Sequence, residues 1–153
     1  MTMRNVTILA AMISVSSLAF AAERSIRRSD LPPAVENALQ RQIKGATVKG
    51  FTTEAEKGRQ TYEAELIVDG HTKDIEFDRN GNIQEVEEEV AFETLSPQIK
   101  AALSTKARGG TVKKVESLRK QDKLVAYEAQ VEKSGKHFEI QVDPSGETLH
   151  HEE

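Results

Sequence analysis

Alternating carboxylates are the residues of this sequence best placed to do chemistry. Two runs, Tyr62–Leu66 and Asp74–Asp78, alternate apolar and acidic side chains. Because the side chains of a β-strand point alternately to opposite faces, each run predicts a strand with one apolar face and one acidic face. The candidate partner-binding residues are those on the acidic side, Glu63, Glu65, Asp74, Glu76 and Asp78.

This acidic surface has two open interpretations. Like charges on neighbouring strands repel when they lie directly opposite one another, so the face has a stability cost. It is either an ordinary solvated face or a docking surface for a basic partner or for cations, whose approach the negative field would accelerate. Residues 22–91 hold 10 basic and 15 acidic side chains, whereas residues 92–153 hold 10 of each. The acidic excess therefore lies in the first half of the chain.

Metal chemistry has few candidate ligands in this sequence. His150 and His151 stand beside two glutamates, and imidazole with carboxylate can bind copper, nickel or zinc. Adjacent side chains on a strand point to opposite faces, so we predict no metal site from this pair. Asp78–Asn82 has the oxygen ligands of a calcium loop, but the sixth position, which must be glycine, is isoleucine. We predict a hairpin turn there.

No catalytic or cofactor-binding motif occurs in the sequence. The nucleophile elbow, the zinc-protease motif, the P-loop and the dinucleotide-binding glycine pattern are all absent. Cysteine is also absent, which excludes disulfides, iron–sulfur clusters and thiol catalysis. The net charge of -4 argues against a nucleic-acid-binding protein, which needs a positive surface. We expect a protein that is not an enzyme and needs no cofactor.

The first 21 residues have the composition of a secretory signal peptide. Arg4 is the only charged residue, an apolar run covers Val6–Phe20, and Ala19-Phe20-Ala21 forms a small-residue cleavage site. The apolar run of 15 residues is shorter than the roughly 20 residues that span a bilayer. Cleavage after Ala21 would leave a mature chain of residues 22–153 with a flexible start over 22–28. We predict export to the periplasm and no membrane span in the mature protein.

An internal repeat organises the rest of the chain. The first two matching pairs are offset by 64 residues and the third by 65. The pairs are Leu31–Leu39 with Leu95–Leu103, Gly45–Lys49 with Gly109–Lys113, and Tyr62–Leu66 with Tyr127–Val131. We predict one repeat over residues 29–90 and a second over residues 91–153.

Each repeat has the pattern of a helix followed by antiparallel strands. In the second repeat Ser96 is a suitable N-cap, Pro97 suits the first helical position, and Gly109 suits the helix end. In the first repeat proline stands where Ser96 would cap, so Asp30 is an alternative cap. The fold class is α+β, with two tandem repeats that each pack one helix on an antiparallel sheet of about four strands. The apolar positions predicted to face the helices are Tyr62, Leu66, Ile75, Phe77, Tyr127, Ala129, Val131, Phe138, Ile140 and Val142.

The strand and turn pattern resembles a known family. A Tyr-Glu-Ala-x-(Leu/Val) strand, a glycine turn, an (Asp/Glu)-Ile-x-(Phe/Val)-Asp strand and an (Asn/Ser)-Gly turn occur over residues 62–81 and 127–146. This pattern resembles the PepSY-like family of exported bacterial proteins, which is related in shape to beta-lactamase inhibitory protein. The resemblance covers residues 29–153 and implies export and a helix-plus-sheet fold. The shared positions are core and turn positions, so no inhibitory residue transfers to this chain.

These observations favour a non-catalytic periplasmic binding module of a protein-interaction or inhibitor-like kind. Its expected partner is a basic protein in the cell envelope. The alternative is an envelope metal-binding or stress-sensing accessory protein that uses the acidic face or the histidines at positions 150 and 151. The two functions differ in the ligand that the acidic residues would hold.

Overall fold

The computed structural model of the chain describes residues 24–56 and 58–149. These residues form two α-helices, two 3-10 turns and nine strands. The first half contains β1 (Arg24–Ser25), η1 (Arg28–Asp30), α1 (Pro33–Gln42), β2 (Thr47–Glu56), β3 (Arg59–Val68), β4 (His71–Asp78) and β5 (Ile83–Glu89). The second half contains η2 (Phe92–Thr94), α2 (Pro97–Lys106), β6 (Thr111–Lys120), β7 (Lys123–Lys133), β8 (Lys136–Val142) and β9 (Thr148–Leu149).

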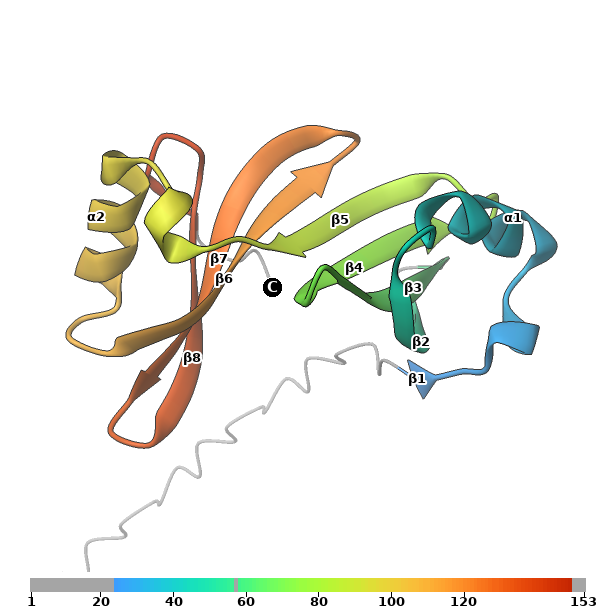
Figure 1. The fold of residues 1–153 in the computed structure, drawn as a ribbon, viewed down its shortest axis with the longest axis horizontal. Coiled ribbons are helices and arrows are strands. Elements are labelled where there is room, and N and C mark those ends of the chain that lie inside the picture. The colour runs from blue at the N-terminus through green and yellow to red at the C-terminus, as the bar shows by residue number, and fades with distance from the viewer. Residues whose placement is uncertain (1–23, 57, 150–153) are drawn as a thin grey trace, which may run out of the picture.

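All nine strands belong to one antiparallel sheet. Their order in the sheet follows their order in the chain, from β1 at one edge to β9 at the other. The sheet twists between its ends, so that β7 and β8 run in a different direction from β4 and β5 (Figure 1). The α+β class and the antiparallel pairing are confirmed.

The sequence predicted a separate sheet for each repeat, whereas the structure has one continuous sheet. The two halves join where β5 pairs with β6, from Glu85 opposite Lys120 to Glu89 opposite Glu116. Each of these strands would otherwise be an edge with unpaired backbone groups, and pairing them removes both edges. Because this contact depends on matching two edges rather than on hydrophobic periodicity, the sequence pattern did not predict it.

The two helices begin in different ways. In α2 the Ser96 hydroxyl accepts a hydrogen bond from the Ile99 amide at 3.3 Å, which confirms the predicted N-cap. In α1 the N-cap is Pro32, which has no side-chain cap. Asp30 does not cap α1, because its carboxylate accepts from the Arg27 amide at 3.1 Å and holds η1 instead.

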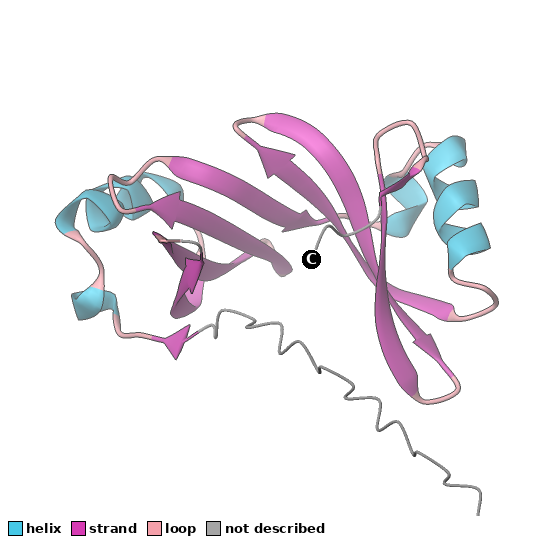
Figure 2. Cartoon of the chain, turned by 180° about the vertical axis from the view of Figure 1, so that it is seen from behind, coloured by secondary structure: helices cyan, strands magenta, loops and turns pink. Residues whose placement is uncertain are grey.

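The helices cover the same face of the sheet. In the first half the core includes Leu39 and Leu66, which are 0% and 1% exposed, and in the second half it includes Leu103 and Val115, which are 0% and 2% exposed. The β5–β6 register keeps these two cores on one side. Val86, opposite Ile75, shares a strand face with Glu88, and Glu88 lies opposite Ser117, which shares a strand face with Val115. The helices lie at opposite ends of the molecule, as the view from behind also shows (Figure 2). The other face of the sheet carries neither of these helices.

Aspartate side chains organise two corresponding turns. Asp78 accepts hydrogen bonds from the amides of Asn80 and Asn82 at 2.8 and 2.9 Å. Asp143 accepts from the amides of Ser145 and Glu147 at 2.9 and 2.8 Å. These contacts confirm a hairpin turn after Asp78, because its carboxylate is used to hold the turn itself.

Some predictions fall outside the described residues. The signal peptide over residues 1–21 does so, and so do His150 and His151. Among the described helices, none has the length and apolar character needed to cross a bilayer.

Candidate partner-binding face

Four of the five candidate carboxylates lie together on the sheet face opposite the helices. Glu63 on β3 lies directly opposite Glu76 on β4, and Glu65 lies directly opposite Asp74. The fifth candidate, Asp78, is at the end of β4 and folds into the turn that follows it. The strand period of two therefore placed four side chains correctly and missed the local use of the fifth.

The face extends beyond these four residues into β5 and the second half. On β5, Glu87 lies opposite Asp74 and Glu85 lies opposite the bulge-flanking Glu76. We define the acidic face as the eight carboxylates Glu63, Glu65, Asp74, Glu76, Glu85, Glu87, Glu116 and Glu128.

Glu116 and Glu128 were not among the residues that the sequence singled out. Glu116 on β6 reaches this face through the β5–β6 pairing, where it lies opposite Glu89. Glu128 on β7 lies opposite Glu116. The repeat could have pointed to Glu128, because it aligns with Glu63 at the offset of 65. No such signal exists for Glu116.

Three of these carboxylates converge where the two halves join. One carboxylate oxygen from each of Asp74, Glu87 and Glu116 lies within 4.8 Å of the other two. Glu116 is 4% exposed, although neither helix lies on its side of the sheet. Neighbouring side chains of the twisted sheet therefore bury it, and negative charge accumulates in a partly dry place.

Two lysines neutralise part of this charge. Lys114 Nζ lies 2.6 Å from Glu116 Oε1, and Lys120 Nζ lies 2.8 Å from Glu85 Oε2. Thr72 Oγ1 lies 3.3 Å from both Glu89 Oε2 and Glu116 Oε1. Lys114 and Lys120 thus each pair with one carboxylate of the acidic face.

Burial, together with the crowding of carboxylates, raises the pKa values of several of them. Burial raises the pKa of Glu87 to about 8, with added repulsion from Glu128, Glu85 and Glu116 and a hydrogen bond with Glu85. Burial also raises the pKa of Asp74 and that of Glu76, and neighbouring carboxylates add to both shifts. The ionised face is therefore strained by its own charge, which a proton or a bound cation would relieve.

A carboxylate beside this cluster has the opposite environment. Glu89 accepts a hydrogen bond from the Thr72 amide at 3.1 Å, which holds the pKa of Glu89 below its usual value. His71 Nδ1 lies 3.8 Å from Glu89 Oε1. The raised pKa values therefore belong to Asp74, Glu76 and Glu87 and not to every acid on these strands.

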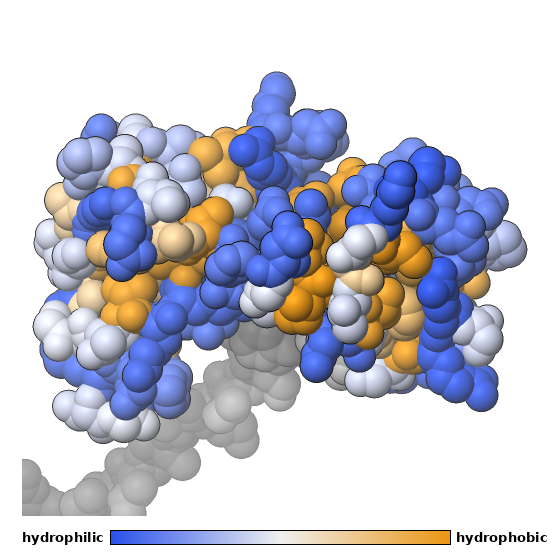
Figure 3. Space-filling view, in the orientation of Figure 1, coloured by the Kyte–Doolittle hydropathy of each residue, from blue (hydrophilic) through white to orange (hydrophobic). Residues whose placement is uncertain are grey.

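In the orientation of Figure 1, the surface of the molecule shows both hydrophilic and apolar side chains. Hydrophilic side chains run between two regions where apolar side chains reach the surface (Figure 3). Separately from this view, the clustered carboxylates of the acidic face could bind cationic groups, either the lysines and arginines of a protein or a hard metal ion.

Solved structures with the same fold come from Bacteroides. A protein from Bacteroides eggerthii, described as a "putative periplasmic" protein, has a TM-score of 0.63 at 18% identity over 78% of this chain and 86% of its own. A DUF2874 family protein from Bacteroides ovatus has a TM-score of 0.60 at 16% identity over 78% and 85%. A BLIP-like protein from Bacteroides fragilis has a TM-score of 0.55 at 26% identity over 76% and 82%.

Sequence comparison gives a consistent result. No curated protein matches the chain. Residues 60–150 match the sequence model of the family described as "Putative beta-lactamase-inhibitor-like, PepSY-like". This match spans more than half of the chain and agrees with the resemblance of the strand and turn pattern. The chain belongs to the PepSY-like, beta-lactamase-inhibitor-like family.

Proposed function

We propose that this protein is a non-catalytic binding module of the periplasm whose acidic face docks a basic segment of a protein partner. The observation that carries the proposal is the convergence of one carboxylate oxygen each from Asp74, Glu87 and Glu116 within 4.8 Å, on the sheet face that neither α1 nor α2 covers. Like charges held this close lower stability, and a cationic partner would turn the same arrangement into attraction.

The burial of the carboxylates favours docking over simple solvation. A solvated face would leave its carboxylates in water, where each keeps an ordinary pKa. Here Glu116 is 4% exposed and burial raises the pKa of Glu87 to about 8. Side chains that are already partly desolvated lose less hydration when a partner covers them, which favours binding.

The proposed location has two supports. The first 21 residues have the pattern of a signal peptide, and a protein of the same fold from Bacteroides eggerthii is described as "putative periplasmic". The family description, beta-lactamase-inhibitor-like, is consistent with a binding role that involves no catalysis.

Capture from native periplasmic extract tests this function. Immobilised residues 22–153 should retain one dominant basic protein at low salt and release it at high salt, because salt screens exposed charge pairs. The variant Glu63→Gln/Glu65→Gln/Glu76→Gln should retain about tenfold less of it.

The control variant neutralises three exposed carboxylates elsewhere, as Glu93→Gln/Asp122→Asn/Glu147→Gln. It has the same net charge as the acidic-face variant and should retain the partner like the unmodified chain. Equal losses in both variants would show that net charge, and not the acidic face, governs retention.

A second candidate function, envelope metal binding, rests on the same three carboxylates. Hard divalent cations such as Ca²⁺ take six to eight oxygen ligands, and Asp74, Glu87 and Glu116 could supply part of such a set. Calcium should then raise the melting temperature of residues 22–153, reversibly with chelator and not in Asp74→Asn/Glu87→Gln. An unchanged melting temperature would reject this candidate.

A further inference from the structure

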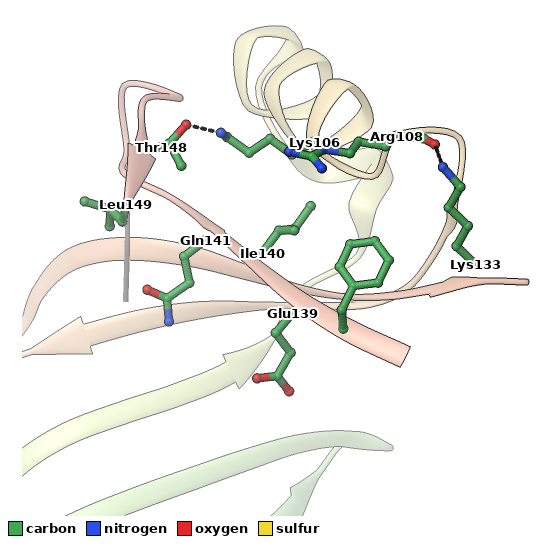
Figure 4. Close-up of a pocket in the computed structure, with 9 residues that line it drawn as sticks. Lys106, Arg108, Lys133, Glu139, Ile140, Gln141, Thr148 and Leu149 are labelled. Atoms are coloured by element: carbon green, nitrogen blue, oxygen red, sulfur yellow. Dashed lines mark hydrogen bonds between the residues drawn. The ribbon is translucent and has the colours of Figure 1, made fainter. Parts of the chain in front are cut away.

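A cavity of about 610 Å³ lies at the other end of the molecule from the first-half core, beside the outer edge of β8. Its walls come from the end of α2, the β7–β8 hairpin and β9 (Figure 4). Phe138, Ile140 and Leu149 provide its apolar surface, and Lys106, Arg108 and Lys133 provide its charge. This size is typical of sites that bind ligands or short peptide segments.

The cavity is positive in a protein that is otherwise acidic. Lys106 Nζ donates to the Thr148 hydroxyl, and Lys133 Nζ donates to the Arg108 carbonyl, which fixes both ammonium groups at its rim (Figure 4). Among the residues that the structure describes, no carboxylate forms an ion pair with any of these three cations. Glu139 is the single acid of the lining. With three cations and one acid in its lining, the cavity therefore offers an excess of positive charge to an anionic group.

The cavity also lies along the outer edge of β8. The short strand β9 pairs with β8 at only two positions, Gln141 opposite Leu149 and Val142 opposite Thr148. Over residues 24–56 and 58–149, no strand pairs with the outer edge of β8 from Lys136 to Ile140. Backbone groups on such an edge are a template for an added strand, and β9 shows the antiparallel direction that the edge accepts.

The register fixes which side chains of an added strand would enter the cavity. Phe138 lies opposite Val131 and Ile140 lies opposite Ala129, so both point to the helix-covered face. Lys133, two residues after Val131 on β7, points the same way. Alternate side chains of an added strand would therefore meet an apolar floor between cationic groups.

We propose that the β8 edge binds an extended acidic segment of a protein as an additional antiparallel strand. Backbone hydrogen bonds pair the added strand with β8, and an apolar side chain of the added strand covers Phe138 and Ile140. Carboxylates on either side of that apolar residue meet the cations Lys106, Arg108 and Lys133. A second copy of this chain is a poorer occupant, because its own β8 edge would bring the same cations against these. The site is distinct from the acidic face and selects a partner of opposite charge.

A designed peptide pair tests this site. The probe is a fluorescein-labelled Thr-Glu-Thr-Val-Thr-Glu-Thr peptide, whose β-branched residues favour an extended chain and whose alternate side chains are Glu, Val and Glu. The control peptide has lysine in place of both glutamates. In fluorescence anisotropy with residues 22–153, the acidic peptide should bind at least about tenfold more tightly than the basic one, and more weakly as salt rises.

Protein variants locate the binding. Arg108→Glu/Lys133→Glu should weaken binding of the acidic peptide about tenfold. The matched control Lys44→Glu/Lys123→Glu makes the same charge change at exposed lysines away from the cavity and should leave binding unchanged. If the first variant fails to fold, the affinities of the acidic and basic peptides for the unmodified chain still test whether the site prefers an acidic strand.

Hydrogen exchange tests the strand geometry. Peptide binding should slow amide exchange within Lys136–Ile140 of β8. Binding without this protection, or equal affinity for both peptides, would overturn the proposal. Protection of this edge in the free chain would also overturn it, since the edge would already be occupied by the chain's own residues or by a second copy.

Discussion

Glu87 is the carboxylate of the acidic face whose pKa is shifted far above its ordinary value. Burial raises its pKa to about 8, compared with 4.5 for an ordinary glutamate. A carboxyl group with a raised folded-state pKa reduces stability as pH rises from the unfolded to the folded pKa, here from 4.5 to about 8. Below 4.5 the penalty is absent, and above about 8 it is complete.

The variant Glu87→Gln should therefore stabilise the protein at alkaline pH. We expect its free energy of unfolding in urea to exceed that of the unmodified chain by about 1–2 kcal/mol at pH 8, after allowing for screening by water, and by little at pH 5. Glu93→Gln, at an exposed position, is the control and should show no such pH dependence. A stability difference for Glu87→Gln that is the same at both pH values would contradict the assignment.

At the residue scale, the sequence predicted the half of the acidic face that lies on β3 and β4. Alternation along β3 and β4 placed Glu63, Glu65, Asp74 and Glu76 on one face. It could not place Glu116, because that residue joins the face only through the register between β5 and β6. The alternation also did not show that the Asp78 carboxylate accepts hydrogen bonds within the turn that follows it. Such bonds depend on the local conformation of the turn and not on the two-residue period of a strand.

At the element scale, the turn between β4 and β5 is held against α1. Gly81 has a φ of +79°, and a Cβ placed on it would lie 2.4 Å from the carbonyl oxygen of Ala34 in α1. Gly70, in the turn between β3 and β4, has a φ of +88° with nothing within 4 Å of such a Cβ. The two glycines have similar left-handed backbone conformations and differ in the space around them.

This difference gives a matched pair of substitutions. Gly70→Ala should lower the free energy of unfolding by about 1 kcal/mol through left-handed backbone strain alone. Gly81→Ala should lower it by about 2 kcal/mol more, because the turn must also move away from α1. Urea titration of both variants measures the difference between their free energies of unfolding. Equal losses would mean that the contact between this turn and α1 is unimportant.

Helices, strands and turns were accessible from the sequence because each depends on neighbours along the chain. The Ser96 cap, the hairpin turn after Asp78 and the apolar faces of β3 and β7 are of this kind. The joining of two expected sheets into one is not, since it depends on which distant edges meet. The outer edge of β8 was missed for the same reason.

At the scale of the whole molecule, one sheet connects two hydrophobic cores. Leu39 and Leu103 are both fully buried, one in each core. Because the β5–β6 ladder and the Lys120–Glu85 ion pair cross between the halves, we expect them to unfold together.

Tyrosine fluorescence can follow each half separately, since Tyr62 and Tyr127 are the two tyrosines of the chain. Tyr62→Phe and Tyr127→Phe each leave one reporter. Leu39→Ala should destabilise the protein by about 3 kcal/mol and lower the midpoint reported by Tyr127 as much as that reported by Tyr62. An unchanged Tyr127 midpoint would show that the halves unfold independently.

The binding role of the acidic face is tested most directly by one equilibrium measurement. Surface plasmon resonance would give the dissociation constant of the captured partner for residues 22–153, for Glu63→Gln/Glu65→Gln/Glu76→Gln and for Glu93→Gln/Asp122→Asn/Glu147→Gln. We expect the acidic-face variant to bind at least about tenfold more weakly and the control variant to bind unchanged. Equal dissociation constants for all three proteins would contradict the proposed docking surface.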